Sequence, residues 1–175
     1  FLRVGSLATL PEGFENVTWY GNGPVEAFND RQTYARQGVY ENTVSGFFYA
    51  YEKVDDCGTL TDVVWMKVAK DGLDNALLVV AEDQVEASTL HFTPDDLNAV
   101  THPYGLSPRE ETILSVNYGS MGTGGATCGP ATLRQYQLPS STVYNWAFTL
   151  MPVAADADAA AVYETAKGYH TVDSF

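Results

Sequence analysis

The residues with the clearest capacity for chemistry lie in the stretch SMGTGGATCGPATL, residues 120–133, where four glycines surround Cys128. Such a loop could hold a phosphate, bind a metal or present a reactive thiol. A phosphate-binding loop needs a lysine and a Ser or Thr at its end, followed by a helix. This loop has no lysine, and the residues after Pro130 return to a strand-like pattern. The sequence therefore argues against a nucleotide site.

Metal binding and thiol catalysis need partner residues that the spacing does not provide. The chain has two cysteines and three histidines: Cys57, Cys128, His91, His102 and His170. None of them forms the C-x-x-C or H-x-x-x-H spacing of a zinc site, and no D-x-D-x-D-G calcium loop is present. A catalytic cysteine also needs a histidine base, which the spacing does not place. We therefore expect two reduced thiols and no metal, with Cys128 a small residue in a tight turn.

A pair of carboxylates could also do chemistry, because glycoside hydrolysis uses two of them on either side of the scissile bond. Glu26 and Asp30 lie four residues apart in EAFNDR, and Arg31 follows directly. The alternative is an ion pair that fixes the conformation of a loop. With 22 acidic residues in the chain, a carboxylate pair arises easily by chance, so the ion pair is the favoured interpretation.

Composition narrows the class of protein further. The chain has 175 residues, of which 45% are hydrophobic, so it can bury a core and is not a disordered segment. Its net charge of −13 disfavours nucleic acid and anionic membrane surfaces as partners. It has no apolar run of the ~20 residues that a membrane span needs.

The elements that must position these residues are mostly strands. Alternation of apolar and polar residues predicts strands over residues 15–21, 61–68, 76–82, 111–119 and 141–151. Thr93 as N-cap followed by Pro94 predicts a short helix, and residues 156–168 predict a second one. We expect an antiparallel all-β sandwich over residues 1–152, and a helical tail or the start of a following element over residues 153–175.

One string resembles a known family. The motif W-x-G-x-G-P-x-E-x-[YF]-x-D-R is present as Trp19, Gly21, Gly23, Pro24, Glu26, Phe28, Asp30 and Arg31. It is similar to the C-terminal β-sandwich, or small-chain domain, of glycoside hydrolase family 2 β-galactosidases. Further similar segments follow in order at residues 57–65, 88–130 and 144–152, so the resemblance covers residues 1–152.

The resemblance implies a fold, and it implies that the catalytic residues lie in other domains of the enzyme. The fold would be the C-terminal part of a galactose-mutarotase-like supersandwich. The parent enzyme would hydrolyse terminal β-D-galactosides such as lactose with retention. Its catalytic glutamates and its Mg and Na sites lie in other domains, so this chain alone would hold no catalytic residue and no cofactor. The preceding domains would be its partners, the parent could form a homo-oligomer, and a bacterial cytoplasmic location is expected.

The resemblance also assigns a place to the glycine-rich loop. In many family members a G-G-D-x-S-W-G segment brings a tryptophan to the mouth of the active site, where it packs against the sugar. The matching residues are Gly124, Gly125, Cys128 and Gly129. Cys128 stands at the tryptophan position and the acidic residue is absent. A cysteine offers less apolar surface to a sugar than an indole ring does.

Two other functions fit parts of the sequence. The 11 tyrosines and three tryptophans are compatible with an accessory carbohydrate-binding module without catalysis. A mutarotase-like epimerase would need a histidine and a carboxylate at one sugar ring. His91 or His102 with Glu110 or Glu111 could supply them only if the fold brought them together.

Overall fold

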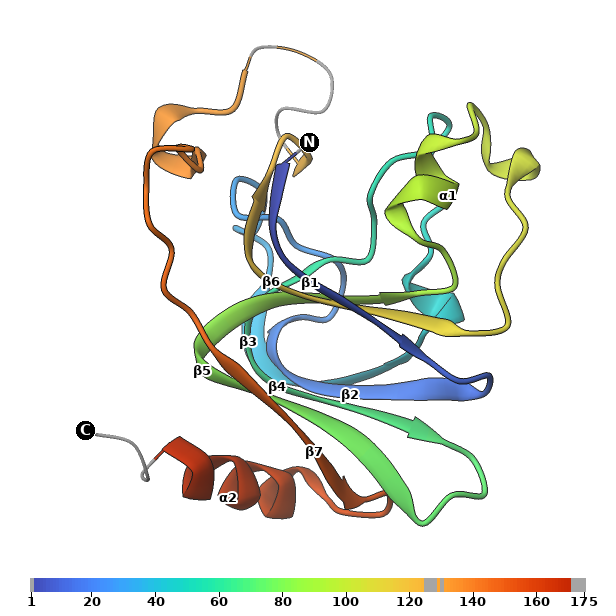
Figure 1. Ribbon diagram of the computed structural model, residues 1–175, viewed down its shortest axis with the longest axis vertical. Coiled ribbons are helices and arrows are strands. Elements are labelled where there is room, and N and C mark those ends of the chain that lie inside the picture. The colour runs from blue at the N-terminus through green and yellow to red at the C-terminus, as the bar shows by residue number, and fades with distance from the viewer. Residues whose placement is uncertain (1, 125–128, 130, 171–175) are drawn as a thin grey trace.

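The computed structural model describes residues 2–124, 129 and 131–170 (Figure 1). Seven strands form the body of the molecule: β1 (Leu2–Leu10), β2 (Phe14–Gly23), β3 (Arg36–Thr43), β4 (Leu60–Lys70), β5 (Asn75–Leu90), β6 (Thr112–Met121) and β7 (Phe148–Ala154). Two α-helices, α1 (Pro94–Asn98) and α2 (Ala159–His170), and short 3-10 turns at Ser45–Phe47, Pro103–Gly105 and Arg134–Tyr136 complete the described elements.

The strands are joined by antiparallel pairs in the order β1-β6-β5-β4-β2-β3, and β7 pairs with β5. Strand β5 is the key element because its two halves have different neighbours. Residues 75–81 pair with β7, whereas residues 86–90 pair with β6. The strand therefore bends, and the sheet folds over itself (Figure 1). The predicted all-β, antiparallel, sandwich-like fold is confirmed.

The main core lies between the two folded parts of the sheet. Its largest fully buried side chains are Trp19, Phe47, Leu60, Met66, Leu114, Val17 and Val79. The Trp19 ring contacts the rings of Tyr40 and Phe47, with centroids 5.5 and 5.4 Å away, and its indole N–H donates to the carbonyl of Asn22 at 3.0 Å. The first residue of the family-like motif is thus a core residue that anchors the end of β2.

A second, smaller core lies on the other face of the sheet, under α2. Trp65, Leu78 and Val80 of the sheet contact Val162 and Ala166 of the helix, and all five side chains are buried. The predicted helix over residues 156–168 is present as α2. It begins after Asp158, whose carboxylate accepts the backbone N–H of Ala161 at 2.9 Å. The expected domain boundary at residue 152 stays a prediction.

Most of the predicted local structure is confirmed, including the strands over residues 15–21, 61–68, 76–82 and 111–119. The Thr93 N-cap is also present: its hydroxyl accepts the backbone N–H of Asp96 at 3.1 Å, and the Asp96 carboxylate accepts the N–H of Thr93 at 2.8 Å.

Two expectations about the chain between the glycine-rich loop and α2 are wrong. Residues 131–138 contain a 3-10 turn rather than a strand, and β7 begins only at Phe148. Beyond Ala81 the edge of β5 turns away from β7 toward β6. The carbonyl of Ala147 still accepts the backbone N–H of Glu82 at 3.0 Å, but residues 141–146 do not pair with a strand. Leu150 on β7 is 45% exposed.

Candidate functional site

The centre of the family-like motif is the carboxylate of Glu26, which is 4% exposed. One of its oxygens accepts a hydrogen bond from Arg31 Nη2 at 2.6 Å and another from the hydroxyl of Tyr51. The other oxygen accepts the backbone N–H of Gly58 at 2.9 Å. Glu26 therefore joins the turn after β2 to the segment before β4. The predicted ion pair that fixes a loop is confirmed as the pair of Glu26 and Arg31.

The two glycines of the motif are required by close approach. A Cβ on Gly21 would lie 2.9 Å from Val63 Cα on β4. A Cβ on Gly23 would lie 2.5 Å from the ring of Tyr40 on β3. Pro24 follows through a cis peptide bond and is exposed. The motif thus keeps the end of β2 close to its two neighbouring strands and directs the chain out toward the surface.

The glycine-rich loop begins directly against this motif. Gly124 has a φ of +73°, and a Cβ there would lie 2.1 Å from Asp30 Oδ1 and 3.0 Å from Phe28 Cβ. The backbone can therefore adopt this position only because residue 124 has no side chain. The structure places Asp30 against the loop and Glu26 in the interior, so the two carboxylates do not form a catalytic pair.

The rest of the predicted loop is only partly visible in the structure. Gly129 has a φ of +158°, which residues with a side chain rarely adopt, and a Cβ there would meet no atom within 4 Å. Gly125 and Cys128 lie outside the described residues.

A pocket of about 310 Å³ lies between the motif and the start of the loop. It is lined by Phe28, Arg31, Tyr51, Lys53, Asp55, Asp56, Thr123 and Gly124. Its volume is at the lower end of the range for small-molecule sites, and its lining combines aromatic rings with hydrogen-bonding groups. This pocket is the candidate functional site, because the family-like motif and the glycine-rich loop meet there.

Two of the charged side chains that line the pocket, Arg31 and Asp56, are held by neighbouring side chains. The Arg31 guanidinium lies over the Phe28 ring, 5.2 Å from its centroid, while Nη2 is bound to Glu26. The carboxylate of Asp56 accepts a hydrogen bond from Arg3 Nη2 at 2.6 Å. Burial raises the pKa of Asp56, although the Arg3 cation opposes that effect. Lys53 is exposed at the rim. These groups suit recognition of a polar, hydroxyl-bearing ligand.

Four of these residues were not predicted, namely Tyr51, Lys53, Asp55 and Asp56. They belong to the segment YAYEKVDD before β4, where two tyrosines are followed by four charged residues. That composition is a weak signal for an exposed binding loop, and it carries no spacing that identifies one. Glu26 connects this segment to the motif, because it binds Tyr51 across 25 positions of the sequence.

The epimerase-like arrangement is not assembled. His91 Nε2 lies 2.8 Å from Glu15 Oε2, and its Nδ1 lies 3.0 Å from the backbone oxygen of Glu111. His102 Nδ1 lies 3.3 Å from the backbone oxygen of Glu52. Each histidine therefore binds a different segment of the chain, and Glu111 contributes its carbonyl rather than its carboxylate.

Within residues 2–124, 129 and 131–170, no group of three His, Cys, Asp or Glu side chains is placed to hold a metal ion. Among the helices that the structure describes, none is long and apolar enough to cross a membrane.

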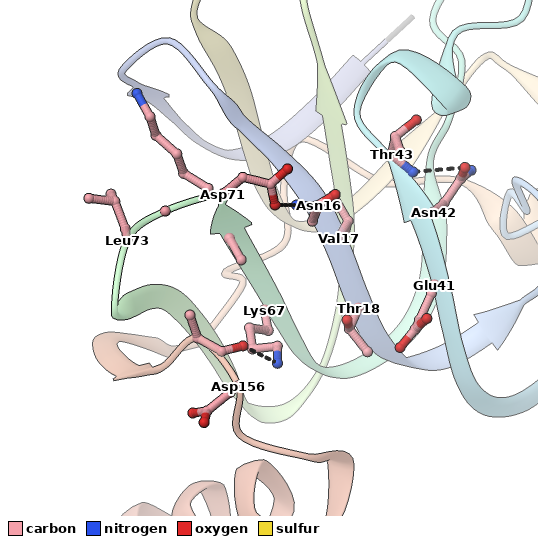
Figure 2. Close-up of a pocket in the computed structure, with 14 residues that line it drawn as sticks. Asn16, Val17, Thr18, Glu41, Asn42, Thr43, Lys67, Asp71, Leu73 and Asp156 are labelled. Carbon is pink, nitrogen blue, oxygen red and sulfur yellow. Dashed lines mark hydrogen bonds between the residues drawn. The ribbon is translucent and has the colours of Figure 1, made fainter.

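A wider cleft of about 640 Å³ lies elsewhere, over the outer face of β2, β3 and β4 (Figure 2). Among the described residues that line it, none is aromatic. Lys67 is already bound there, because its ammonium donates to the carbonyls of Ala155 and Ala157 at 3.0 and 2.7 Å. The cleft contains none of the predicted site residues and offers no ring for a sugar to stack on.

The thiol of Cys57 is expected to be chemically inert. The side chain is fully buried, and burial raises its pKa to about 12. In a Cys128→Ser chain, where Cys57 is the remaining thiol, reaction with a disulfide reagent should be at least about 100-fold slower in the folded than in the unfolded protein. Equal rates in the two states would contradict the buried position. The measurement is the absorbance of the released thiolate, with and without denaturant.

The sequence is similar to a protein family and to individual proteins of known activity. Residues 1–150 match the family described as "Beta galactosidase small chain". The chain is similar to a beta-galactosidase of Priestia megaterium, with 33% identity over 152 residues, or 86% of this chain and 15% of that protein. It is also similar to the beta-galactosidases of Staphylococcus xylosus (26% identity, 78% of this chain, 14% of the relative) and Kluyveromyces lactis (27%, 86% and 14%). The chain spans about 15% of the length of these relatives. It belongs to the beta-galactosidase small-chain family.

Proposed function

We propose that this domain fragment completes the substrate site of a β-galactosidase without contributing a catalytic residue. The parent enzyme would hydrolyse terminal β-D-galactosides, lactose among them, with retention. The loop over residues 122–129 and the adjoining pocket would form part of the mouth of that site. The observation that carries the proposal is the contact of Gly124 with Asp30 and Phe28, which fixes the start of the loop beside a pocket of hydrogen-bonding groups.

The chemistry of the pocket supports recognition rather than bond cleavage. Glu26 is engaged by Arg31, Tyr51 and the N–H of Gly58, so its oxygens are not available as acid or nucleophile. The rim presents cationic and anionic groups next to the ring of Tyr51, which is 39% exposed, and such mixed surfaces bind sugar hydroxyls through hydrogen bonds and sugar faces through rings. The catalytic glutamates and the Mg and Na sites are proposed to lie in other domains of the parent.

Replacement of Gly124 tests this role in the full-length enzyme. In Gly124→Ala the new methyl group collides with Asp30 and lies 3.0 Å from Phe28 Cβ, so either the Asp30 side chain or the start of the loop must move. We expect kcat/KM for a β-galactoside to fall about 10-fold or more, because small displacements of positioning groups have effects of this size. The change should appear mainly in KM, since the loop contacts substrate rather than the reacting bond.

A matched control separates the collision from the cost of the backbone conformation. Gly72 has a φ of +79°, close to that of Gly124, but a Cβ there would meet no atom within 4 Å. Gly72→Ala should therefore lose only the stability that the backbone conformation costs and leave kcat/KM unchanged. If both variants, or neither, changed kcat/KM, the loop would have no special relation to the substrate.

The location of the parent enzyme is a further part of the proposal. A bacterial cytoplasmic enzyme is consistent with relatives from Priestia megaterium and Staphylococcus xylosus. Cell fractionation with a β-galactosidase assay on each fraction tests it, and activity in the culture medium would contradict it.

A further inference from the structure

A long part of the chain is almost free of charge. Between residues 112 and 155 the only charged side chain is Arg134, and all 22 acidic residues of the protein lie elsewhere. A chain with a net charge of −13 is thus divided into an acidic portion and a nearly neutral one. The neutral portion comprises β6, the glycine-rich loop, residues 131–147 and β7.

Residues 131–147, here called the arm, run outside the sheet between the loop and β7 (Figure 1, orange). Leu133 is 66% exposed and Val143 is 82% exposed. Exposed apolar surface is also present on β6, where Tyr118 is 41% exposed. The centroid of its ring lies 4.9 Å from that of Tyr144 on the arm. Exposed apolar side chains with a single charge, Arg134, among them are typical of a surface that another protein surface covers.

The arm has a defined shape of its own. The Gln137 side-chain amide donates to the carbonyl of Thr132 at 2.8 Å, and the Tyr144 hydroxyl donates to the carbonyl of Pro139 at 2.8 Å. The backbone N–H of Leu138 donates to Met121 Sδ at 3.1 Å, which ties the arm to the end of β6. These bonds prearrange the exposed side chains, and a prearranged surface loses less entropy on binding.

We propose that the arm is the surface on which another domain of the same β-galactosidase binds this one. The chain spans about 15% of its relatives, and its family is described as a small chain, so a much larger part of the enzyme has to contact it. Charged residues are depleted at the centres of interfaces, which is the composition of the arm and not of the remaining surface. The inference rests on the family assignment and not on the proposed role of the loop.

Thiol accessibility in the full-length enzyme tests this surface. Leu133→Cys and Val143→Cys are placed on the arm in a Cys128→Ser background. Leu73→Cys and Val39→Cys are matched controls, because Leu73 is 47% exposed and Val39 is 48% exposed at sites away from the arm. Labelling by a maleimide is followed at each position by mass spectrometry, in the native and in the urea-unfolded enzyme.

We expect labelling at positions 133 and 143 to be about 10-fold or more slower in the native enzyme than in the unfolded one, because interface cores exclude water. Labelling at both arm positions within about 3-fold of the unfolded rate would overturn the proposal, whatever the controls do. Protection that disappears when the oligomer is diluted to single subunits would also overturn it, because the arm would then bind a second copy. Hydrogen exchange over residues 131–147 of the unmodified enzyme repeats the test without substitutions.

Discussion

Glu26→Ala should lower the free energy of unfolding of this domain by about 3 kcal/mol, the largest loss expected from removing one polar side chain here. The carboxylate is buried and accepts hydrogen bonds from Arg31, Tyr51 and the N–H of Gly58. Without it, the N–H of Gly58 and the hydroxyl of Tyr51 lose their acceptor inside the protein. The Arg31 side chain is 41% exposed and can be rehydrated, which places the loss at the low end for a broken buried ion pair.

Urea unfolding followed by tryptophan fluorescence measures this loss. Glu26→Gln keeps an acceptor oxygen in place, so it should lose less than Glu26→Ala. Glu41→Ala is the matched control, because Glu41 is an exposed glutamate on β3. If Glu26→Ala were no less stable than Glu41→Ala, the Glu26 hydrogen bonds would not hold the segment before β4 against the motif.

Much of the fold could be predicted because its signals are local. Alternation of apolar residues marks β2, β4, β5 and β6, and the Thr93-Pro94 pair marks the start of α1. The bend of β5 has no such signal, since the pattern of residues 76–82 is that of an ordinary strand. The change of partner from β7 to β6 along that strand depends on contacts between distant segments. That change is also why residues 141–147 are not a strand.

The candidate site was predictable to the extent that its residues form a contiguous motif. Glu26 and Arg31 are close in sequence, and their ion pair follows from that spacing. The contact of Gly124 with Asp30 joins residues 94 positions apart. Only the folded chain shows that Asp30 leaves no space for a side chain at position 124. Lys53 and Asp56 enter the pocket through the same kind of long-range packing.

A second buried carboxylate, Glu86, should make the stability of the domain depend on pH. Glu86 lies on β5 opposite Asn117 of β6 and is 3% exposed. Among the described residues, its oxygens form no hydrogen bond of good geometry, and Ser120 is close enough only to oppose the effect of burial in part. Burial raises its pKa from the ordinary 4.5 to about 7, against the opposing effects of Ser120 and Arg3 and with a smaller contribution from the charge of Asp56.

The sign of the effect follows from which state holds the proton more tightly. The native state keeps Glu86 protonated up to about pH 7, whereas the unfolded chain releases that proton near pH 4.5. Between these values the native state binds more protons, so stability falls as the pH rises. The loss is complete above the native pKa, where folding must bury a charged carboxylate, and amounts to about 3 kcal/mol. The raised pKa of Asp56 acts in the same direction.

Glu86→Gln should remove this dependence, because the amide fills the same space without titrating. We expect the variant to exceed the unmodified chain in unfolding free energy by about 3 kcal/mol more at roughly pH 8.5 than at roughly pH 4.5. Urea unfolding across this range measures the difference, and Glu82→Gln, an exposed position on the same strand, should leave the pH profile unchanged. Parallel profiles for Glu86→Gln and the unmodified chain would mean that Glu86 is charged in the native state at neutral pH. Any pH dependence would then come from other carboxyls with shifted pKa values, namely Asp56, whose pKa burial raises, or Glu15 and Asp96, whose pKa values hydrogen bonds lower.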